Sequence, residues 1–134
     1  MCSYPILQFA NEQFVELAAE RPSVGDRLCM LGWGKSCDSF SCDVAPHLGS
    51  VCATAIEAAD AEAHHGPMDW EGGFLCVDTA GDRATCRGDS GGPLFDESGK
   101  LVGVSSFGAV FGCGVGSPAC FVSISQYLDW ISDG

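Results

Sequence analysis

The chain has 134 residues, a length typical of one domain with its own core. Eighteen aspartates and glutamates outnumber six lysines and arginines, and the formal net charge of -12 argues against binding to nucleic acid or anionic lipid. No apolar run is long enough to cross a bilayer, so a membrane partner is not expected.

Nine cysteines indicate a secreted, extracellular protein with disulfides, because reducing compartments keep thiols unpaired. None of them has metal-ligand spacing with a nearby histidine, so no metal or other cofactor is expected. The start, Met1 to Phe14, does not look like a signal peptide: it has no basic residues, and Gln8, Asn11 and Glu12 interrupt its apolar stretch. A secreted composition without an export signal, together with the odd number of cysteines, indicates that upstream sequence is missing. We therefore interpret Met1 as a fragment boundary or an internal methionine.

Short apolar runs punctuated by glycine predict most of the secondary structure as strands. The turn-forming residues 96–100 join two of these runs into a hairpin. We therefore expect an all-β protein with strands at Ile6–Phe9, Arg27–Leu31, Phe74–Val77, Pro93–Phe95, Leu101–Phe107 and Ala119–Ile124.

Two segments are predicted to be helical. Val51–Ala63 is alanine-rich, with Ser50 placed as an N-cap, and Ser125–Ile131 has apolar residues at helical spacing. At the end of the first helix, His64 and His65 diverge too much to share a metal, so we expect both to be exposed to solvent.

The most specific feature is the run Gly88-Asp89-Ser90-Gly91-Gly92-Pro93, with Cys86 two places ahead of it. Glycines on both sides of Ser90 let the backbone approach a substrate and aim N–H groups at a developing oxyanion. A loop of this kind presents one serine hydroxyl to a carbonyl carbon. The run therefore predicts a hydrolase with Ser90 as its nucleophile.

This run closely resembles the catalytic serine region of chymotrypsin-like serine proteases. Gly32-Trp33-Gly34, Ser105-Ser106-Phe107-Gly108 and Tyr127-Leu128-Asp129-Trp130-Ile131 are similar to further blocks of that family, so the resemblance covers about Gly25 to the end. It looks closest to invertebrate digestive chymotrypsins and collagen-degrading proteases.

The resemblance implies that residues 1–134 are part of a chymotrypsin-like peptidase domain. Residues 25–134 would form the second barrel of the two-barrel fold, an antiparallel six-stranded β-barrel with a short C-terminal helix. Residues 1–24 match weakly and would form the segment between the barrels.

The resemblance also implies the roles of individual residues in a serine-type endopeptidase. Ser90 would attack a peptide carbonyl to give an acyl-enzyme, and the N–H groups of Gly88 and Ser90 would form the oxyanion hole. Asp89 would form the salt bridge that locks this loop after activation cleavage. The substrate would be a protein or peptide.

The specificity pocket implied by the resemblance is neutral. Ala84 would lie at its base and Gly108 and Ala119 on its walls, while the Ser106 strand would pair with the substrate backbone and Phe107 stands where tryptophan is usual. A pocket without a carboxylate cannot compensate for desolvating a lysine or arginine. We therefore expect a preference for apolar or aromatic residues on the acyl side of the cleaved bond.

Two disulfides follow from the resemblance: Cys52 with Cys76, and Cys86 with Cys113. Cys37 and Cys42 lie five residues apart, so they either bond to each other or Cys42 bonds to sequence that is absent here. No partner is assigned to Cys2, Cys29 or Cys120.

The remaining members of a catalytic triad are not found. None of His47, His64 and His65 stands in the family's Ala-Ala-His-Cys context, and Ser3 takes the place of the triad aspartate. We therefore expect the isolated chain to be inactive and its partner to be the missing N-terminal barrel. The alternative is a catalytically inactive protease homologue that acts as a binding module.

Overall fold

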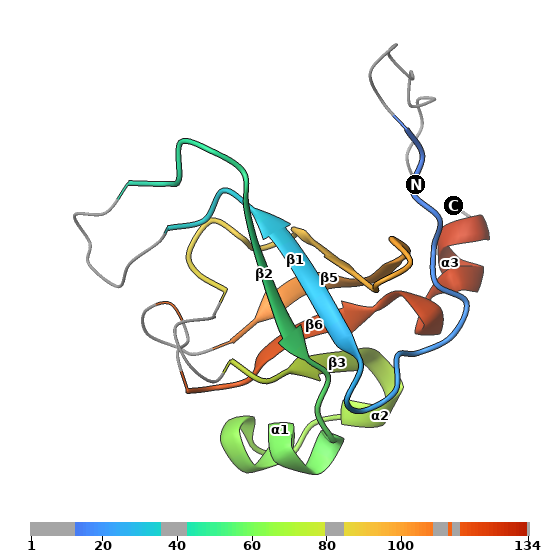
Figure 1. Ribbon diagram of the computed structural model, residues 1–134. Helices are drawn as coiled ribbons and strands as arrows, with labels where there is room; N and C mark the ends of the chain where they lie inside the picture. Colours follow the sequence, from blue (N-terminus) through green and yellow to red (C-terminus); the bar gives the residue numbers. More distant parts are fainter. Residues whose placement is uncertain (1–12, 36–42, 80–84, 109–112, 114–115, 134) are drawn as a thin grey trace.

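The computed structural model describes residues 13–35, 43–79, 85–108, 113 and 116–133 (Figure 1). Its strands are β1 (Arg27–Gly32), β2 (Gly49–Thr54), β3 (Phe74–Val77), β4 (Pro93–Phe95), β5 (Leu101–Phe107) and β6 (Ala119–Ser123). Its helices are α1 (Ala58–His65), α2 (Trp70–Gly73), the 3-10 turn η1 (Ile124–Gln126) and α3 (Leu128–Asp133). Several expected features lie outside the described residues: the strand at Ile6–Phe9, Ser3, and the cysteines Cys2, Cys37 and Cys42.

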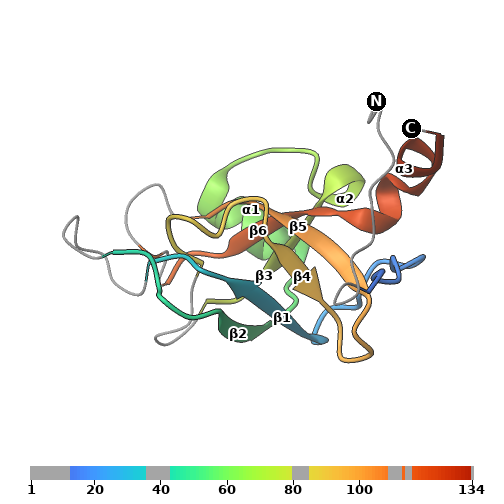
Figure 2. The same ribbon diagram turned by 90° about the horizontal axis from the view of Figure 1, so that it is seen from above.

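The strands form one antiparallel sheet in the order β2-β1-β4-β5-β6-β3. Its two edge strands meet just beyond their ends, where Asp78 N–H donates to the Thr54 carbonyl at 2.9 Å and Ile56 N–H donates to the Cys76 carbonyl at 3.0 Å. The sheet therefore closes on itself, and the expected six-stranded barrel is confirmed (Figure 2). Helices α1 and α2 lie beside β3, and α3 lies apart from them at the C-terminal end (Figure 1).

The barrel is filled by the apolar residues that alternate along its strands, because successive side chains of a strand point to opposite faces. Burial of one large apolar side chain stabilises the fold by about 1.5–3 kcal/mol. The largest fully buried apolar side chains come from five different strands: Leu28, Leu75, Leu94, Val102 and Phe121.

The segment that precedes β1 is tied to the barrel. Leu17 pairs in parallel with Leu101, whose N–H donates to the Glu16 carbonyl at 2.9 Å. Further along, the Arg21 guanidinium donates to the carbonyls of Trp70 and Phe74. This segment therefore connects the start of β5 with α2.

The expected helix over Val51–Ala63 is wrong in its first half. Residues 49–54 form β2 instead, so Ser50 is a strand residue, and the helix begins at Ala58 after an extended Glu57. Val51 pairs with Met30 of β1 and packs against the core. Pairing and burial outweigh the intrinsic helix propensity of this alanine-rich stretch.

The expected C-terminal helix over Ser125–Ile131 is divided in the structure. Residues 124–126 form η1, and α3 begins only at Leu128. A second helix, α2, was not expected; Asp69 caps it by accepting a hydrogen bond from Gly72 N–H at 3.0 Å.

Two disulfides join residues that face each other on neighbouring strands. Cys29 of β1 bonds to Cys52 of β2, and Cys76 of β3 bonds to Cys120 of β6, with Cα atoms 4.0 and 4.1 Å apart. The expected pairing of Cys52 with Cys76 is therefore wrong, because each has a cross-strand neighbour within bonding reach. In the chain-entropy model each cross-link stabilises the fold by roughly 3–4 kcal/mol.

The expected hairpin between β4 and β5 is confirmed, and Asp96 holds its turn. The carboxylate accepts hydrogen bonds from the N–H groups of Ser98 and Lys100, both at 2.9 Å, and from the Ser98 hydroxyl at 2.7 Å. Partial burial alone would raise the pKa of Asp96, but these hydrogen bonds outweigh it, so the pKa lies below its ordinary value.

The Asp96→Asn variant should lose about 1 kcal/mol of unfolding free energy at pH 7, because the bonds to a charged acceptor are weakened. The folded-state pKa is the lower one, so this stabilisation is full above the unfolded value of about 3.9 and is lost as pH falls through the folded pKa. Urea unfolding of both proteins from pH 7 to pH 3 should show the difference shrinking. The exposed neighbour Glu97 provides the control, since Glu97→Gln should change stability by less than about 0.5 kcal/mol.

Candidate functional site

The loop that carries Ser90 is anchored at both ends. Cys86 forms a disulfide with Cys113, as the family resemblance implies. The Cys86 carbonyl also accepts a hydrogen bond from the Asp89 N–H at 3.1 Å. On the other side, Gly91 N–H donates to the Ser105 carbonyl of β5 at 2.9 Å. Ser90 is thereby held beside β5 with its side chain exposed to solvent.

The Asp89 carboxylate is buried beneath this loop, with 8% of the residue exposed. One carboxylate oxygen accepts the Gly34 N–H at 2.8 Å, and the other accepts the Cys86 N–H at 2.9 Å. A Cβ atom at Gly32 or Gly34 would overlap these oxygens. The two glycines of the Gly-Trp-Gly block are therefore needed to make room for Asp89, while Trp33 between them is 57% exposed.

The backbone around Ser90 offers two donors on the same loop. Gly88 has φ +103, a conformation that favours glycine, and a Cβ atom there would lie 3.2 Å from the Gly34 Cα. Among the residues that the structure describes, neither Gly88 N–H nor Ser90 N–H donates to a protein acceptor. Both groups are available to a negatively charged oxygen.

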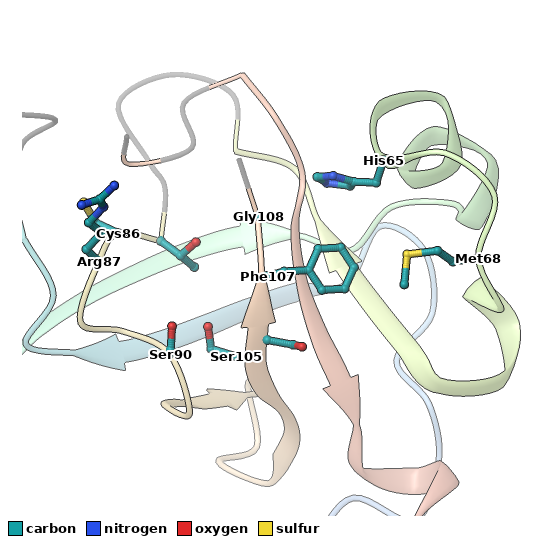
Figure 3. A pocket seen from close by; sticks show the side chains of 10 residues that line it. His65, Met68, Cys86, Arg87, Ser90, Ser105, Phe107 and Gly108 are labelled. Carbon is teal, nitrogen blue, oxygen red and sulfur yellow. The ribbon is translucent and has the colours of Figure 1, made fainter. Parts of the chain in front are cut away.

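A cavity of about 460 Å³ opens beside Ser90 (Figure 3). Phe107 lies in the middle of this view, with Ser90 and Arg87 on one side and His65 and Met68 on the other. The cavity is lined by His65, Met68, Thr85, Cys86, Arg87, Ser90, Ser105, Ser106, Phe107 and Gly108.

A bulge in β5 sets the positions of two expected site residues. Ser105 pairs with Phe121 and Phe107 pairs with Cys120, so Ser106 has no partner on β6 and is exposed. Bulges of this kind redirect side chains next to functional sites. Ser106, Phe107 and Gly108 thus all line the cavity.

The other expected pocket residues are not seen at the cavity. Ala84 lies outside the described residues, and Ala119 is buried in the core with 2% exposure. The Ala119 backbone does lie directly behind Gly108, because a Cβ atom at Gly108 would be 3.8 Å from the Ala119 Cα.

The interpretation of His65 as an exposed residue at a helix end is wrong, although His64 is exposed. The His65 Nε2 lies 2.9 Å from the Pro118 carbonyl, so this nitrogen carries the proton, and the ring packs edge-on against Phe107 with centroids 5.4 Å apart. Trp70 is the next ring, 6.0 Å from His65. His65 therefore forms a wall of the cavity together with Met68.

No sequence pattern identified these two residues as part of a site. The sequence feature that could have pointed to His65 and Met68 is the pair Trp70 and Phe74. These two aromatic residues lie four apart, which indicates an aromatic surface close to the end of α1. Both rings pack against Phe107 at centroid distances of 6.0 and 5.2 Å.

The structure shows no hydrogen-bond partner for the Ser90 hydroxyl among the described side chains. Of the histidines, His65 lines the same cavity, but its Nε2 is bonded to the Pro118 carbonyl. Residues 13–35, 43–79, 85–108, 113 and 116–133 also include no group of three potential metal ligands. Within the same ranges, no helix has the length and apolar character that a bilayer crossing requires.

Comparison with known proteins agrees with this geometry. The sequence model of the family described as Trypsin matches residues 8–131. Brachyurin from Leptuca pugilator is 35% identical over 127 residues, and Serine protease 1 from Drosophila melanogaster is 41% identical over 103 residues. The structure of neuropsin, a serine protease expressed in the limbic system of mouse brain, matches with a TM-score of 0.79 and 28% identity.

These matches cover most of this chain but only part of each relative. The chain is covered to 95% by brachyurin, 76% by the Drosophila protein and 90% by neuropsin, while it covers 54%, 37% and 53% of those proteins. The chain thus spans about half the length of the relatives it matches, or less. Two of the three come from invertebrates, which confirms the resemblance to invertebrate proteases.

The His65→Ala variant should lose about 2 kcal/mol of unfolding free energy, because it leaves the Pro118 carbonyl without its donor and removes the edge-on contact with Phe107. The adjacent His64→Ala variant lies in the same helical turn and should lose less than about 0.5 kcal/mol. Chemical denaturation of the two variants measures the difference, and equal losses would contradict a packing role for His65.

The Gly34→Ala variant should lose about 1–3 kcal/mol of unfolding free energy, because its methyl group would displace the Asp89 carboxylate from its two N–H donors. Gly49→Ala is the matched control in β2, where a new Cβ atom would meet its nearest neighbour, the Gly32 carbonyl oxygen, at an ordinary 3.5 Å. Thermal unfolding of both variants checks the expectation. A Gly34→Ala protein as stable as Gly49→Ala would show that Asp89 can be accommodated elsewhere.

Proposed function

Because the chain belongs to the trypsin family of serine proteases, we propose that it is the serine-bearing barrel of a chymotrypsin-like endopeptidase. Residues 25–134 would be this barrel, and residues 1–24 the segment that leads into it. The observation that carries the proposal is the exposed Ser90, held on an anchored loop with two N–H donors available beside it.

In the proposed reaction the Ser90 oxygen attacks the carbonyl carbon of a peptide bond while a general base takes the hydroxyl proton. The oxygen–carbon bond forms, the carbon–nitrogen bond breaks, and the leaving amine takes up a proton, which leaves an acyl-enzyme. Water then hydrolyses the ester. The Gly88 and Ser90 N–H groups would stabilise the negative oxygen, a contribution of about 10²–10³ in rate for one donor.

Asp89 would act as a positioning residue for these donors. Its carboxylate is held by Gly34 and Cys86, and a second cavity, of about 220 Å³, opens on it between Gly32, Lys35 and Val51. By family resemblance, a new N-terminus would enter here after activation cleavage. A positive charge at this place would be stabilised by the buried carboxylate.

The substrate would be a protein or peptide with an apolar or aromatic residue on the acyl side of the cleaved bond. None of the described residues that line the Ser90 cavity has a carboxylate, so the cavity cannot compensate for a buried lysine or arginine. Ala84 is still expected at the base of the specificity pocket, with Gly108 and Ala119 on its walls. Ser106 to Gly108 would pair with the substrate backbone.

The general base would come from an N-terminal barrel, supplied by the same precursor or by another chain, so we expect the isolated chain to be inactive. The relatives have about the length that a second barrel requires. The disulfides of the barrel favour a secreted, extracellular protein. The rival function is a binding module that uses the same cavity without catalysis, and it is favoured by the lack of a hydrogen-bond partner for the Ser90 hydroxyl among the described side chains.

The test is a fusion of the chain to the part of brachyurin that it does not match. This fusion should react with a fluorophosphonate probe at Ser90 and cleave a peptide that has phenylalanine on the acyl side. Ser90→Ala should reduce kcat/KM by about 10⁵–10⁶, because the nucleophile cannot be replaced by binding alone. Active-site labelling followed by peptide mapping identifies the modified residue.

The chain alone provides the control. It should show no labelling above its own Ser90→Ala variant, and strong labelling of the unmodified chain would contradict the claim that the base is supplied from outside. A fusion that is folded by circular dichroism but shows no reaction at Ser90 would favour the binding module.

A further inference from the structure

We propose that Met68 is an oxidation site through which a hydroperoxide lowers the affinity of the Ser90 cavity for apolar side chains. The reaction converts the Met68 thioether into a sulfoxide, which is polar. Access of the peroxide to Met68 depends only on the fold, whereas the consequence for a peptide substrate rests on the proposed function.

The first observation is that Met68 is accessible where the other described methionine is not. The chain has three methionines, of which Met1 lies outside the described residues. Met30 of β1 is a core residue with 5% exposure, while Met68 is 45% exposed. A peroxide in water reacts only with a sulfur that it can reach, so it should oxidise Met68 well before Met30.

The second observation is that Met68 is presented by a fixed turn. Its carbonyl accepts the Trp70 N–H at 2.9 Å, and the Trp70 indole N–H donates to the Gly66 carbonyl at 3.1 Å. Trp70 is itself buried, with 4% exposure. The backbone on both sides of Met68 is thus anchored by one buried residue, which keeps Met68 at the cavity.

The third observation is the position of the thioether. Met68 lines the cavity together with Ser90 and Phe107. Its side chain points from the segment after α1 towards Phe107 (Figure 3). A thioether is apolar and polarisable, which suits it to contact with aromatic and aliphatic groups. An apolar group that fills this part of the cavity therefore meets the Met68 side chain directly.

The oxidation itself needs no other group of the protein. The sulfur donates an electron pair to one peroxide oxygen, the sulfur–oxygen bond forms, and the oxygen–oxygen bond breaks. The proton of the transferred oxygen passes to the leaving oxygen, so hydrogen peroxide yields one sulfoxide and one water. The sulfur loses two electrons and the peroxide gains them.

The new oxygen would make this wall of the cavity polar. His65, which forms the wall together with Met68, already gives its Nε2 proton to the Pro118 carbonyl, and a neutral imidazole has no second N–H to offer. Water can solvate the sulfoxide as long as no ligand is bound. An apolar ligand would displace this water without replacing its hydrogen bond, so its affinity should fall by about three- to tenfold.

The first test is a peptide map of the chain, and of its fusion to the unmatched part of brachyurin, after exposure to hydrogen peroxide. Mass spectrometry of the digests should find one added oxygen on Met68 while Met30 is still unmodified. Oxidation of both residues at the same rate, or of Met30 first, would overturn the proposal.

The second test measures binding to the fusion with Ser90→Ala, so that no peptide is cleaved. A fluorescent peptide with apolar residues on the acyl side is titrated by fluorescence anisotropy before and after treatment with hydrogen peroxide. The affinity should fall by about three- to tenfold. Treatment with the two methionine sulfoxide reductases, one for each sulfoxide epimer, and a dithiol should restore it.

Met68→Leu is the matched control, because leucine is apolar and of similar size but cannot form a sulfoxide. Each protein is compared with itself before treatment, so a difference in starting affinity does not matter. The affinity of the Met68→Leu fusion, which keeps every other methionine and every disulfide, should not change. An equal loss in both proteins, no loss in either, or no binding of the peptide to either would overturn the proposal.

Failure of the proposed function has a different signature, because hydrolysis by the fusion is measured before any peroxide is added. If Ser90-dependent hydrolysis is found and the Met68 sulfoxide leaves binding unchanged, the proposed function is kept and the role of Met68 is wrong. If the sulfoxide lowers binding but no Ser90-dependent hydrolysis is found, the role of Met68 is kept and the catalytic proposal is wrong.

Discussion

The arrangement of the site depends on one buried carboxylate. Asp89 accepts the Gly34 N–H just beyond the end of β1 and the Cys86 N–H at the start of the serine loop, so it joins two segments that are more than fifty residues apart. A buried carboxylate is costly unless hydrogen bonds compensate for its lost hydration, and the two N–H groups supply this compensation. The glycines at positions 32 and 34 follow from the same constraint, because any side chain there would occupy the place of the carboxylate. The loop that carries Gly88 and Ser90 is therefore held in place by the buried side chain of the residue between them.

The parts of the structure that could be predicted from the sequence are those with a strong local pattern. The strands at 74–77, 93–95 and 101–107 have the expected bounds, because short apolar runs flanked by glycine or turn residues leave few alternatives. The stretch after Ser50 was predicted as a helix because alanine has a high helix propensity, whereas its pairing with β1 is a long-range contact that no local pattern reveals. The partners of Cys29 and Cys120 were missed for the same reason, since they follow from strand register.

The same distinction applies to the site. Ser90 and its neighbours were found because the required residue types are consecutive in sequence. His65 and Met68 reach the cavity from α1 and the turn after it, and their place depends on how this segment packs against Phe107. A histidine at the end of a helix is ordinarily exposed, and only the carbonyl of Pro118, more than fifty residues away, gives its ring a fixed partner. Side chains that converge through tertiary packing leave no spacing pattern in the sequence.

The two cross-strand disulfides have a consequence for the integrity of the barrel. β2 and β3 are the two ends of the strand order, and the barrel closes where the segments following β2 meet β3 through a few hydrogen bonds. Each of these strands is covalently linked to its inner neighbour, β2 to β1 and β3 to β6. If the closing hydrogen bonds open transiently, each end strand is still bonded covalently to its inner neighbour, so neither strand can detach from the sheet. The oxidised cysteines thus keep all six strands in their order when the barrel opens, so that it can close again without new strand pairing.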